Sequence, residues 1–260
     1  MVDIHCHILH GLDDGPKTFD ESVQMAEMAI ADGVTHVIAT PHSNAEYAFR
    51  PDLIRERRDT LQARVEGKLQ IATGCDFHLS YENLLDVQKD PAKYALNQKN
   101  YLLVEFADFA IPPNIDETLH MLQLLGLQPI ITHPERNGLI RHQPEKLWRW
   151  LRQGCLVQVT AQSLIGRFGQ GTAKVLLEWL DKERIHFVAS DAHSLHGRPL
   201  KLREAYQFVA KRRGDEIANA LFYANPLAAF KGEPIPYRPD PPPEKSAAQK
   251  FKKRKRFIFF

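Results

Sequence analysis

Short apolar runs recur along the chain and are separated by segments with a helical spacing of apolar residues. Val2 and Ile4 open the first run, and further runs rich in Val, Ile and Leu lie at 34–42, 68–76, 101–106, 127–135, 155–161 and 184–193. Apolar runs of this length, bounded by turn residues, are typical of buried strands. The pattern therefore predicts seven strand positions.

Helical patterns lie between these runs. Thr18 and Glu21 have the spacing of a capping box, so a helix is expected to begin after Thr18 and to stop at Gly33. Similar patterns cover 52–66, 114–125, 142–153, 171–183 and 199–212. Alternating strands and helices predict a parallel sheet. With about seven such units, an α/β fold that closes into a distorted seven-stranded β/α barrel is favoured over an open sheet.

A proline-rich stretch, PIPYRPDPPP at 234–243, ends this pattern. Proline cannot continue a helix or a central strand, so we expect a folded domain over residues 1–233 and an extended, mobile linker and tail over 234–260. The segment 245–260 contains seven Lys or Arg residues and no acid. Contact with anionic lipid or an acidic partner is one interpretation of this tail, and a solvated end is the other.

The charge of the remaining chain excludes one class of function. The whole sequence has a formal charge of +2, but the first 244 residues hold 27 basic and 32 acidic side chains, a net charge of −5. A nucleic-acid platform would need a basic face on the folded part. We therefore expect no nucleic-acid partner.

The sequence also indicates the cellular compartment of the protein. No apolar run is long enough to predict a membrane span, and no basic-then-apolar leader precedes Asp3. Three scattered cysteines predict no disulfide framework, and none is followed six positions later by arginine, as a cysteine-phosphatase loop would require. We expect a cytoplasmic protein.

Residues able to bind metal follow the predicted strands. In barrels, the site is built where strands end and the following loops begin, so residues far apart in sequence converge there. Imidazole and carboxylate ligands without cysteine suit Mn²⁺, Fe or Zn²⁺, and a set this large can hold two or three ions. The strand-end candidates are His5, His7, His42, Asp76, Glu105, His133, Asp191 and His193.

The remaining histidines are divided into two sets. For five of them we expect packing or solvent roles, because histidine is commonly half-buried without a ligand; these are His36, His120, His142, His186 and His196. The roles of His10 and His78 stay open.

Six stretches, in order, carry a resemblance: DIHCHILHGLDDGP, ATPH, TGCD, LLVEF, THPERN and ASDAH. Together they resemble the PHP (polymerase and histidinol phosphatase) superfamily, and most closely its capsular-polysaccharide, manganese-dependent tyrosine-protein phosphatases. The resemblance covers nearly the whole chain. It implies a distorted seven-stranded barrel and hydrolysis by a metal-activated water. The implied substrate is a phosphotyrosine protein, such as a bacterial tyrosine kinase of capsule or exopolysaccharide synthesis, and a homo-oligomer is left open.

The resemblance also implies roles for individual residues. Three metal sites are implied, made by His5, His7, Asp76 and Asp191; by Asp76, Glu105 and His133; and by Asp14, His42 and His193. Arg136 and Arg198 match arginines that bind the phosphate. Two positions depart from the pattern: Asp76 stands where the family usually has glutamate, and His10 replaces a frequent proline. Aspartate is one methylene shorter, so metal spacing or preference is expected to change.

Three alternatives remain open at this point. Histidinol-phosphate phosphatase, or another PHP phosphoesterase, would share the metal motifs. A metal-dependent amidohydrolase also opens with His-x-His, but it usually has a bridging lysine, whereas Glu105 ends the corresponding strand here. A binding module without catalysis is the third alternative, and the complete set of candidate ligands argues against it.

Overall fold

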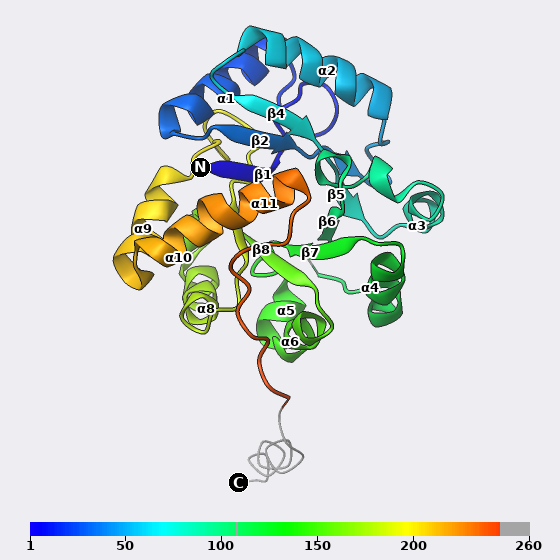
Figure 1. Cartoon of the computed structure of the whole chain (residues 1–260), viewed down its shortest axis with the longest axis vertical. Coiled ribbons are helices and arrows are strands. Elements are labelled where there is room, and N and C mark those ends of the chain that lie inside the picture. The colour runs from blue at the N-terminus through cyan, green and yellow to red at the C-terminus, as the bar shows by residue number, and fades with distance from the viewer. Residues whose placement is uncertain (108, 245–260) are drawn as a thin grey trace.

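The computed structural model describes residues 1–107 and 109–244, in which strands and helices alternate along the chain (Figure 1). The hypotheses about the basic tail concern residues 245–260, which lie outside the described residues. Within the described residues, no helix is both long enough and apolar enough to cross a membrane.

The strands form two parallel sheets. The smaller sheet has the order β1 (Val2–Cys6), β2 (His36–Ala39) and β4 (Gln70–Thr73). The larger sheet has the order β3 (His42–Ser43), β5 (Asp76–His78), β6 (Tyr101–Glu105), β7 (Gln128–Thr132), β8 (Leu156–Thr160) and β9 (Phe187–Ala189). Every pairing between these neighbours is parallel, which confirms the predicted α/β class.

Two of the predicted strands are each split in two. The run 34–42 is interrupted between β2 and β3 at Pro41, which has no N–H to donate to a ladder. The run 68–76 is interrupted between β4 and β5 at Gly74, where a Cβ would lie only 2.8 Å from Leu96 Cδ2. The prediction of continuous strands was wrong at these two points, and the breaks divide the strands into two sheets.

Backbone hydrogen bonds continue the strand pairing through the two breaks and join the two sheets at the edge beside β1 and β9. Gly74 donates to Ala39 O at 2.8 Å and Asp76 donates to Pro41 O at 3.1 Å, across the two breaks. At the edge beside β1 and β9, Asp191 donates to His5 O at 2.8 Å. The fold is thus mixed α/β with two linked parallel sheets.

The long helices occupy the predicted positions. Helix α1 (Phe19–Asp32) has the capping box between Thr18 and Glu21, and Gly33 ends it in the left-handed conformation. The others are α2 (Pro51–Arg64), α4 (Ile115–Leu124), α6 (Glu145–Arg152), α8 (Gln170–Asp181) and α9 (Arg203–Arg213). Short helices without a predicted counterpart are α3 (Tyr81–Val87), η1 (Pro91–Lys93), η2 (Leu96–Gln98), α5 (Gly138–His142), α7 (Ala161–Leu164), α10 (Asp215–Asn219), η3 (Ala220–Ala224) and α11 (Asn225–Lys231).

A core cluster lies among the strands. It takes buried side chains from both sheets, such as Ile4 of β1, Leu103 of β6 and Phe187 of β9. Ala229 and Phe230 of α11 belong to the same cluster, and Figure 1 shows α11 crossing the strands. The last helix therefore covers one end of the strands and leaves the other end for chemistry.

Residues 232–244 have no helix or strand, as the prolines predicted, but they are held in place. Asn225 donates to Tyr237 O at 2.7 Å and accepts from Tyr237 N at 2.9 Å. Arg238 donates to Gly154 O at 2.9 Å, and Arg152 donates to Pro242 O at 3.1 Å. These bonds attach the segment to the folded part, beside the N-terminal ends of the strands.

Candidate metal centre

The predicted strand-end residues converge at the carboxyl ends of the strands. They come from the end of β1 and the loop behind it (His5, His7, Asp14), from β3 and β5 (His42, Asp76), from the ends of β6 and β7 (Glu105, His133) and from the segment after β9 (Asp191, His193). The parallel direction of the strands causes this convergence: His42 and Asp76 begin β3 and β5, just beyond the carboxyl ends of β2 and β4, and the other residues lie at or after the carboxyl ends of β1, β6, β7 and β9.

Their ligand atoms form overlapping groups, in each of which the atoms lie within 4.8 Å of one another. Asp76, Glu105 and His133 form one group, and Asp14, His42 and His193 share another with His7. His5 joins two groups, one with His7 and Asp76 and one with His133 and Asp191. All nine candidates take part, and a tenth residue, His78, forms a group with His42 and Glu105.

Several buried atoms of these side chains have no hydrogen-bond partner. Neither carboxylate oxygen of Asp76 accepts a hydrogen bond, although the residue is fully buried. The Nε2 atoms of His5, His7, His133 and His193 also make none. A buried polar group without a partner is costly, and a charged one more so. Bound cations would satisfy these atoms, so the residues fit a metal cluster.

The distances agree with this interpretation. His5 Nε2 lies 3.4 Å from Asp191 Oδ1 and 3.5 Å from Asp76 Oδ2. His133 Nε2 lies 3.3 Å from Glu105 Oε1, and His193 Nε2 lies 3.2 Å from Asp14 Oδ1. Ligand atoms that each bind an ion at about 2.1 Å are expected to lie roughly 3 Å apart. The side chains are therefore spaced to share ions without large movement.

Neighbouring residues fix the orientation of the imidazoles. His7 Nδ1 lies 2.6 Å from Asp13 Oδ2, and His5 Nδ1 lies 2.9 Å from Gln158 Oε1. Each bond turns the other ring nitrogen, Nε2, toward the cluster. Sequence reasoning assigned no role to Asp13 or Gln158. The signal at Gln158 was a polar residue inside the apolar strand LVQVT, where it is fully buried.

The charges in the centre shift several pKa values. Burial opposes the charged form of His5, but Asp76 and Asp191 outweigh it and raise the pKa of His5 to about 9. Burial likewise opposes the charge on Asp191, and Arg136, His5 and Arg198 together hold its pKa well below the ordinary value. The buried Asp191 carboxylate thus remains ionised beside these cationic side chains.

The backbone is strained at two of the candidate ligands. His133 and Asp191 have positive φ angles of 30° and 51°, which are uncommon for residues with a Cβ. Gly15, in the DDG segment, shows a different constraint, because a Cβ there would lie 2.5 Å from His7 O. Strain of this kind persists where surrounding contacts over-determine the conformation, and it is common at functional sites.

The two predicted arginines lie at the same centre. Arg136 and Arg198 each donate a hydrogen bond to Asp191 Oδ2. Both line a pocket of about 320 Å³, which also includes Asp14, His42 and Glu105. Their guanidinium groups therefore stand beside the candidate metal ligands at an accessible surface.

Of the histidines without a predicted metal role, His78 lies in the centre and the others lie outside the ligand groups of the described part of the chain. His78, left open by the sequence, pairs with Glu105 inside the centre. His10 instead lies 2.9 Å from Arg57 Nη1 and does not line the 320 Å³ pocket. The five histidines expected to have packing or solvent roles occur in none of the ligand groups found among the described residues.

Comparisons with known proteins agree with this arrangement. Residues 1–231 match the family described as "Capsular polysaccharide synthesis, CpsB/CapC". Tyrosine-protein phosphatase YwqE of Bacillus subtilis is 35% identical over 267 residues and 100% of each chain. A solved structure, from work on YwqE of Bacillus subtilis and CpsB of Streptococcus pneumoniae as "unique metal-dependent tyrosine phosphatases", superimposes with a TM-score of 0.86 and 34% identity, over 95% of this chain and 100% of that one.

A more distant likeness shows the fold alone. The histidinol phosphate phosphatase of Lactococcus lactis superimposes with a TM-score of 0.53 and 12% identity, over 85% of this chain and 94% of that one. The overall fold is therefore shared beyond one reaction, and the substrate has to be argued from the site.

Proposed function

Because the chain belongs to the CpsB/CapC family of capsular polysaccharide synthesis, we propose that it is a metal-dependent protein-tyrosine phosphatase that hydrolyses phosphomonoesters. The observation that carries the proposal is the set of buried, unpartnered ligand atoms around Asp76 at the carboxyl ends of the strands. No specific observation favours histidinol phosphate as a substrate, since the likeness to that phosphatase extends only to the fold.

We assign the metal ligands in three sets, the first two of which share Asp76. His5, His7, Asp76 and Asp191 would hold one ion, Asp76, Glu105 and His133 a second, and Asp14, His42 and His193 a third. The ligand groups of the structure support this division, since the second set forms one group and the third lies within another. Imidazole and carboxylate donors without sulfur suit Mn²⁺, which we propose, and also Fe or Zn²⁺. When bound, such ions lower the pKa of water and neutralise phosphoryl oxygens.

The arginines supply the phosphate contacts in this proposal. Guanidinium groups form paired hydrogen bonds with phosphate oxygens, in a geometry that lysine cannot match. Arg136 and Arg198 line the pocket from two different segments, after β7 and after β9. They would orient the ester and stabilise the negative charge that grows on the phosphoryl group.

Phosphotyrosine fits the depth of the centre. The candidate ligands His5, His7 and Asp76 are at most 1% exposed, whereas the side chain of Asp14 is 46% exposed, so a phosphate enters the centre from the side of Asp14 and the two arginines. A phosphotyrosine side chain extends its phosphate farther from the backbone than phosphoserine does. Its phenol leaving group, with a pKa near 10, also departs more readily than an alkoxide. The proposal therefore needs no strong general acid, and His10, held by Arg57, is not assigned that role.

We further infer that the two sheets act as one distorted seven-stranded barrel. The hydrogen bond from Asp191 N to His5 O, which joins the sheets beside β1 and β9, supports this, as does the core cluster that takes side chains from β1, β2, β4, β6, β7, β8 and β9. In this arrangement residues 1–233 form the catalytic domain, and residues 234–260 form an appended linker and tail.

The physiological setting is proposed from the family and the cysteines. A tyrosine kinase of capsule or exopolysaccharide synthesis is the proposed partner, in keeping with the phosphatases that this chain resembles. Cys6, Cys75 and Cys155 are free and buried, which suits a reducing cytoplasm. The tail at 245–260 would add contact with an anionic membrane surface, where such kinase substrates would gather.

Metal analysis combined with an activity assay tests the proposal. Protein purified without chelator should contain at least one transition metal ion per chain and hydrolyse para-nitrophenyl phosphate. His5→Ala and Asp191→Ala should reduce both, whereas His142→Ala, an exposed histidine on α5, is the matched control and should change neither. Protein that remains fully active after its metal is removed would refute the metal-dependent mechanism.

A further inference from the structure

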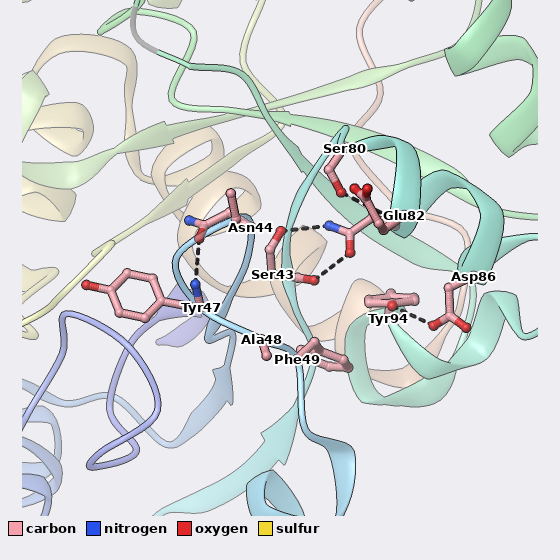
Figure 2. Close-up of a pocket in the computed structure, with 11 residues that line it drawn as sticks. Ser43, Asn44, Tyr47, Ala48, Phe49, Ser80, Glu82, Asp86 and Tyr94 are labelled. Atoms are coloured by element: carbon pink, nitrogen blue, oxygen red, sulfur yellow. Dashed lines mark hydrogen bonds between the residues drawn. The ribbon is translucent and has the colours of Figure 1, made fainter.

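A second pocket lies beside the metal centre. It has a volume of about 520 Å³ and lies between the loop that follows β3, helix α3 and the segment before β6 (Figure 2). Asn44 and Tyr47 line both this pocket and the pocket at the metal centre. A ligand anchored by its phosphate at the metals could therefore extend a neighbouring group into the second pocket.

The shared wall between the two pockets is preformed. Asn44 Oδ1 accepts hydrogen bonds from the backbone N–H groups of Glu46 and Tyr47, both at 2.9 Å, and Asn44 N donates to Tyr47 O at 3.0 Å (Figure 2 shows the bond to Tyr47). A turn closed in this way needs little reordering when a ligand arrives. Binding in the pocket would therefore cost little conformational entropy.

Aromatic rings form one side of the second pocket. Phe49 and Tyr94 stack with their ring centroids 4.8 Å apart and an angle of 28° between the ring planes, and both line the pocket (Figure 2); Phe49 is partly exposed, whereas Tyr94 behind it is only 3% exposed. Faces of aromatic rings attract cations and pack well against aliphatic stems. This wall suits a side chain with an apolar stem and a positive head.

The charged residues that line the pocket also favour a cationic ligand. Glu82 and Asp86 are the charged residues that line the pocket, and Lys and Arg do not occur among its described lining residues. Lys93 of the chain itself makes both kinds of contact: its ammonium group pairs with Asp86 and lies 5.1 Å from the centroid of the Tyr94 ring. Glu82 is exposed and lines the pocket, where its carboxylate is accessible to a second cation.

We propose that this second pocket binds a lysine or arginine side chain of the substrate, close in sequence to the phosphotyrosine. The inference rests on the proposed phosphatase function and narrows its substrate class to phosphotyrosine segments with a neighbouring basic residue. Glu82 attracts the cationic head, and the partly exposed ring of Phe49, backed by Tyr94, receives the stem. The metal centre then hydrolyses the phosphate ester, and the second pocket selects substrates with a neighbouring lysine or arginine.

A peptide series tests the proposal. Each peptide carries one phosphotyrosine and a single Lys, Ala or Glu, moved through about four positions on either side, a reach of about 13 Å in extended chain. At the best position, kcat/KM for the Lys peptide should exceed that for the Glu peptide by about fivefold, the combined size of an exposed ion pair and a cation–π contact. Every value is divided by the kcat/KM of the same protein for para-nitrophenyl phosphate, which carries no peptide.

Three variants make the test specific to the pocket. Glu82→Gln should bring the ratio of Lys to Glu peptides toward one, and Glu82→Lys should make the Glu peptide the better substrate. Glu66→Gln removes the same charge at an exposed turn after α2 and should keep the wild-type ratio.

The possible failures are distinguishable. Equal rates for all peptides in the wild-type protein, or a ratio unchanged by both Glu82 substitutions, would overturn the second-pocket proposal while leaving the phosphatase proposal intact. A protein that hydrolyses neither para-nitrophenyl phosphate nor any phosphotyrosine peptide in the presence of Mn²⁺ would overturn the phosphatase proposal itself.

Discussion

Asp13 offers a sharp test of how the metal centre is organised, because it binds no ion in our assignment and acts through its neighbours. Its Oδ2 atom lies 2.6 Å from His7 Nδ1 and accepts from His42 N at 3.1 Å, while its Oδ1 atom accepts from Gly15 N at 2.9 Å. The substitution Asp13→Asn keeps the shape of the side chain but replaces one acceptor oxygen with an NH₂ group. At least one of the three donors then loses its acceptor.

The size of the effect follows from these bonds. A buried hydrogen bond to a charged group contributes about 1.5–3 kcal/mol, and Asp13 is only 5% exposed. Losing one such bond to His7 corresponds to roughly a 10- to 100-fold loss in metal affinity, the range seen when residues that orient metal ligands are replaced. We therefore expect Asp13→Asn to bind Mn²⁺ about 30-fold more weakly.

Calorimetric titration of metal-stripped protein with Mn²⁺ measures this loss directly, and activity at saturating Mn²⁺ shows how much is recovered. Because the ligands themselves remain, kcat should recover more fully in Asp13→Asn than in Asp191→Ala. Asp20→Asn, an exposed acid in the first turn of α1, removes the same charge and is the control. An affinity for Mn²⁺ within twofold of wild type in Asp13→Asn would refute the orienting role.

Three further predictions concern other parts of the chain. Asp76→Ala should abolish nearly all activity and lower the metal content, because neither carboxylate oxygen of Asp76 has a hydrogen-bond partner among the described residues, which leaves both to bind ions. Asp76→Glu should keep a substantial part of the activity. Near-normal metal content in Asp76→Ala would exclude a role of Asp76 as a ligand shared by two ions. Burial lowers the pKa of His186 to about 3, so this side chain stays neutral in the folded protein. In the unfolded chain the same side chain takes up a proton below about pH 6.5, so the free energy of unfolding falls as the pH drops. Urea unfolding should show that wild type loses about 2 kcal/mol more than His186→Gln between pH 7 and pH 5, and equal losses would contradict this. Deleting 245–260 should leave turnover of para-nitrophenyl phosphate unchanged and weaken binding to anionic vesicles, and unchanged vesicle binding would leave the tail as a solvated end.

The sequence predicted those parts of the fold that local patterns determine. The first helix could be placed to the residue because Thr18 and Glu21 cap it and Gly33 ends it. The strand-end candidate ligands could be predicted to lie close together because parallel strands bring all their carboxyl ends to one side, whatever the order of the strands in the sheet. Neither inference needed knowledge of which side chains touch.

Other features depend on contacts that periodicity does not encode. The break at Gly74 lies against Leu96, a residue of η2 that no pattern predicted, and leaves no room there for a Cβ. The roles of Asp13 and Gln158 depend on which imidazole each one faces. The wall of the second pocket comes from α3 and the segment behind it, where helices are too short for a spacing signal.

The central claim is that this metal centre hydrolyses phosphotyrosine, and one comparison of kcat/KM tests it most directly. A phosphotyrosine peptide, the matching phosphoserine peptide and histidinol phosphate are assayed at the same Mn²⁺ concentration, before and after removal of the metal. We predict that the phosphotyrosine peptide is the best of the three substrates and that removal of the metal abolishes its hydrolysis. An advantage of histidinol phosphate by about tenfold or more, equivalent to about 1.4 kcal/mol in transition-state binding, would contradict the claim.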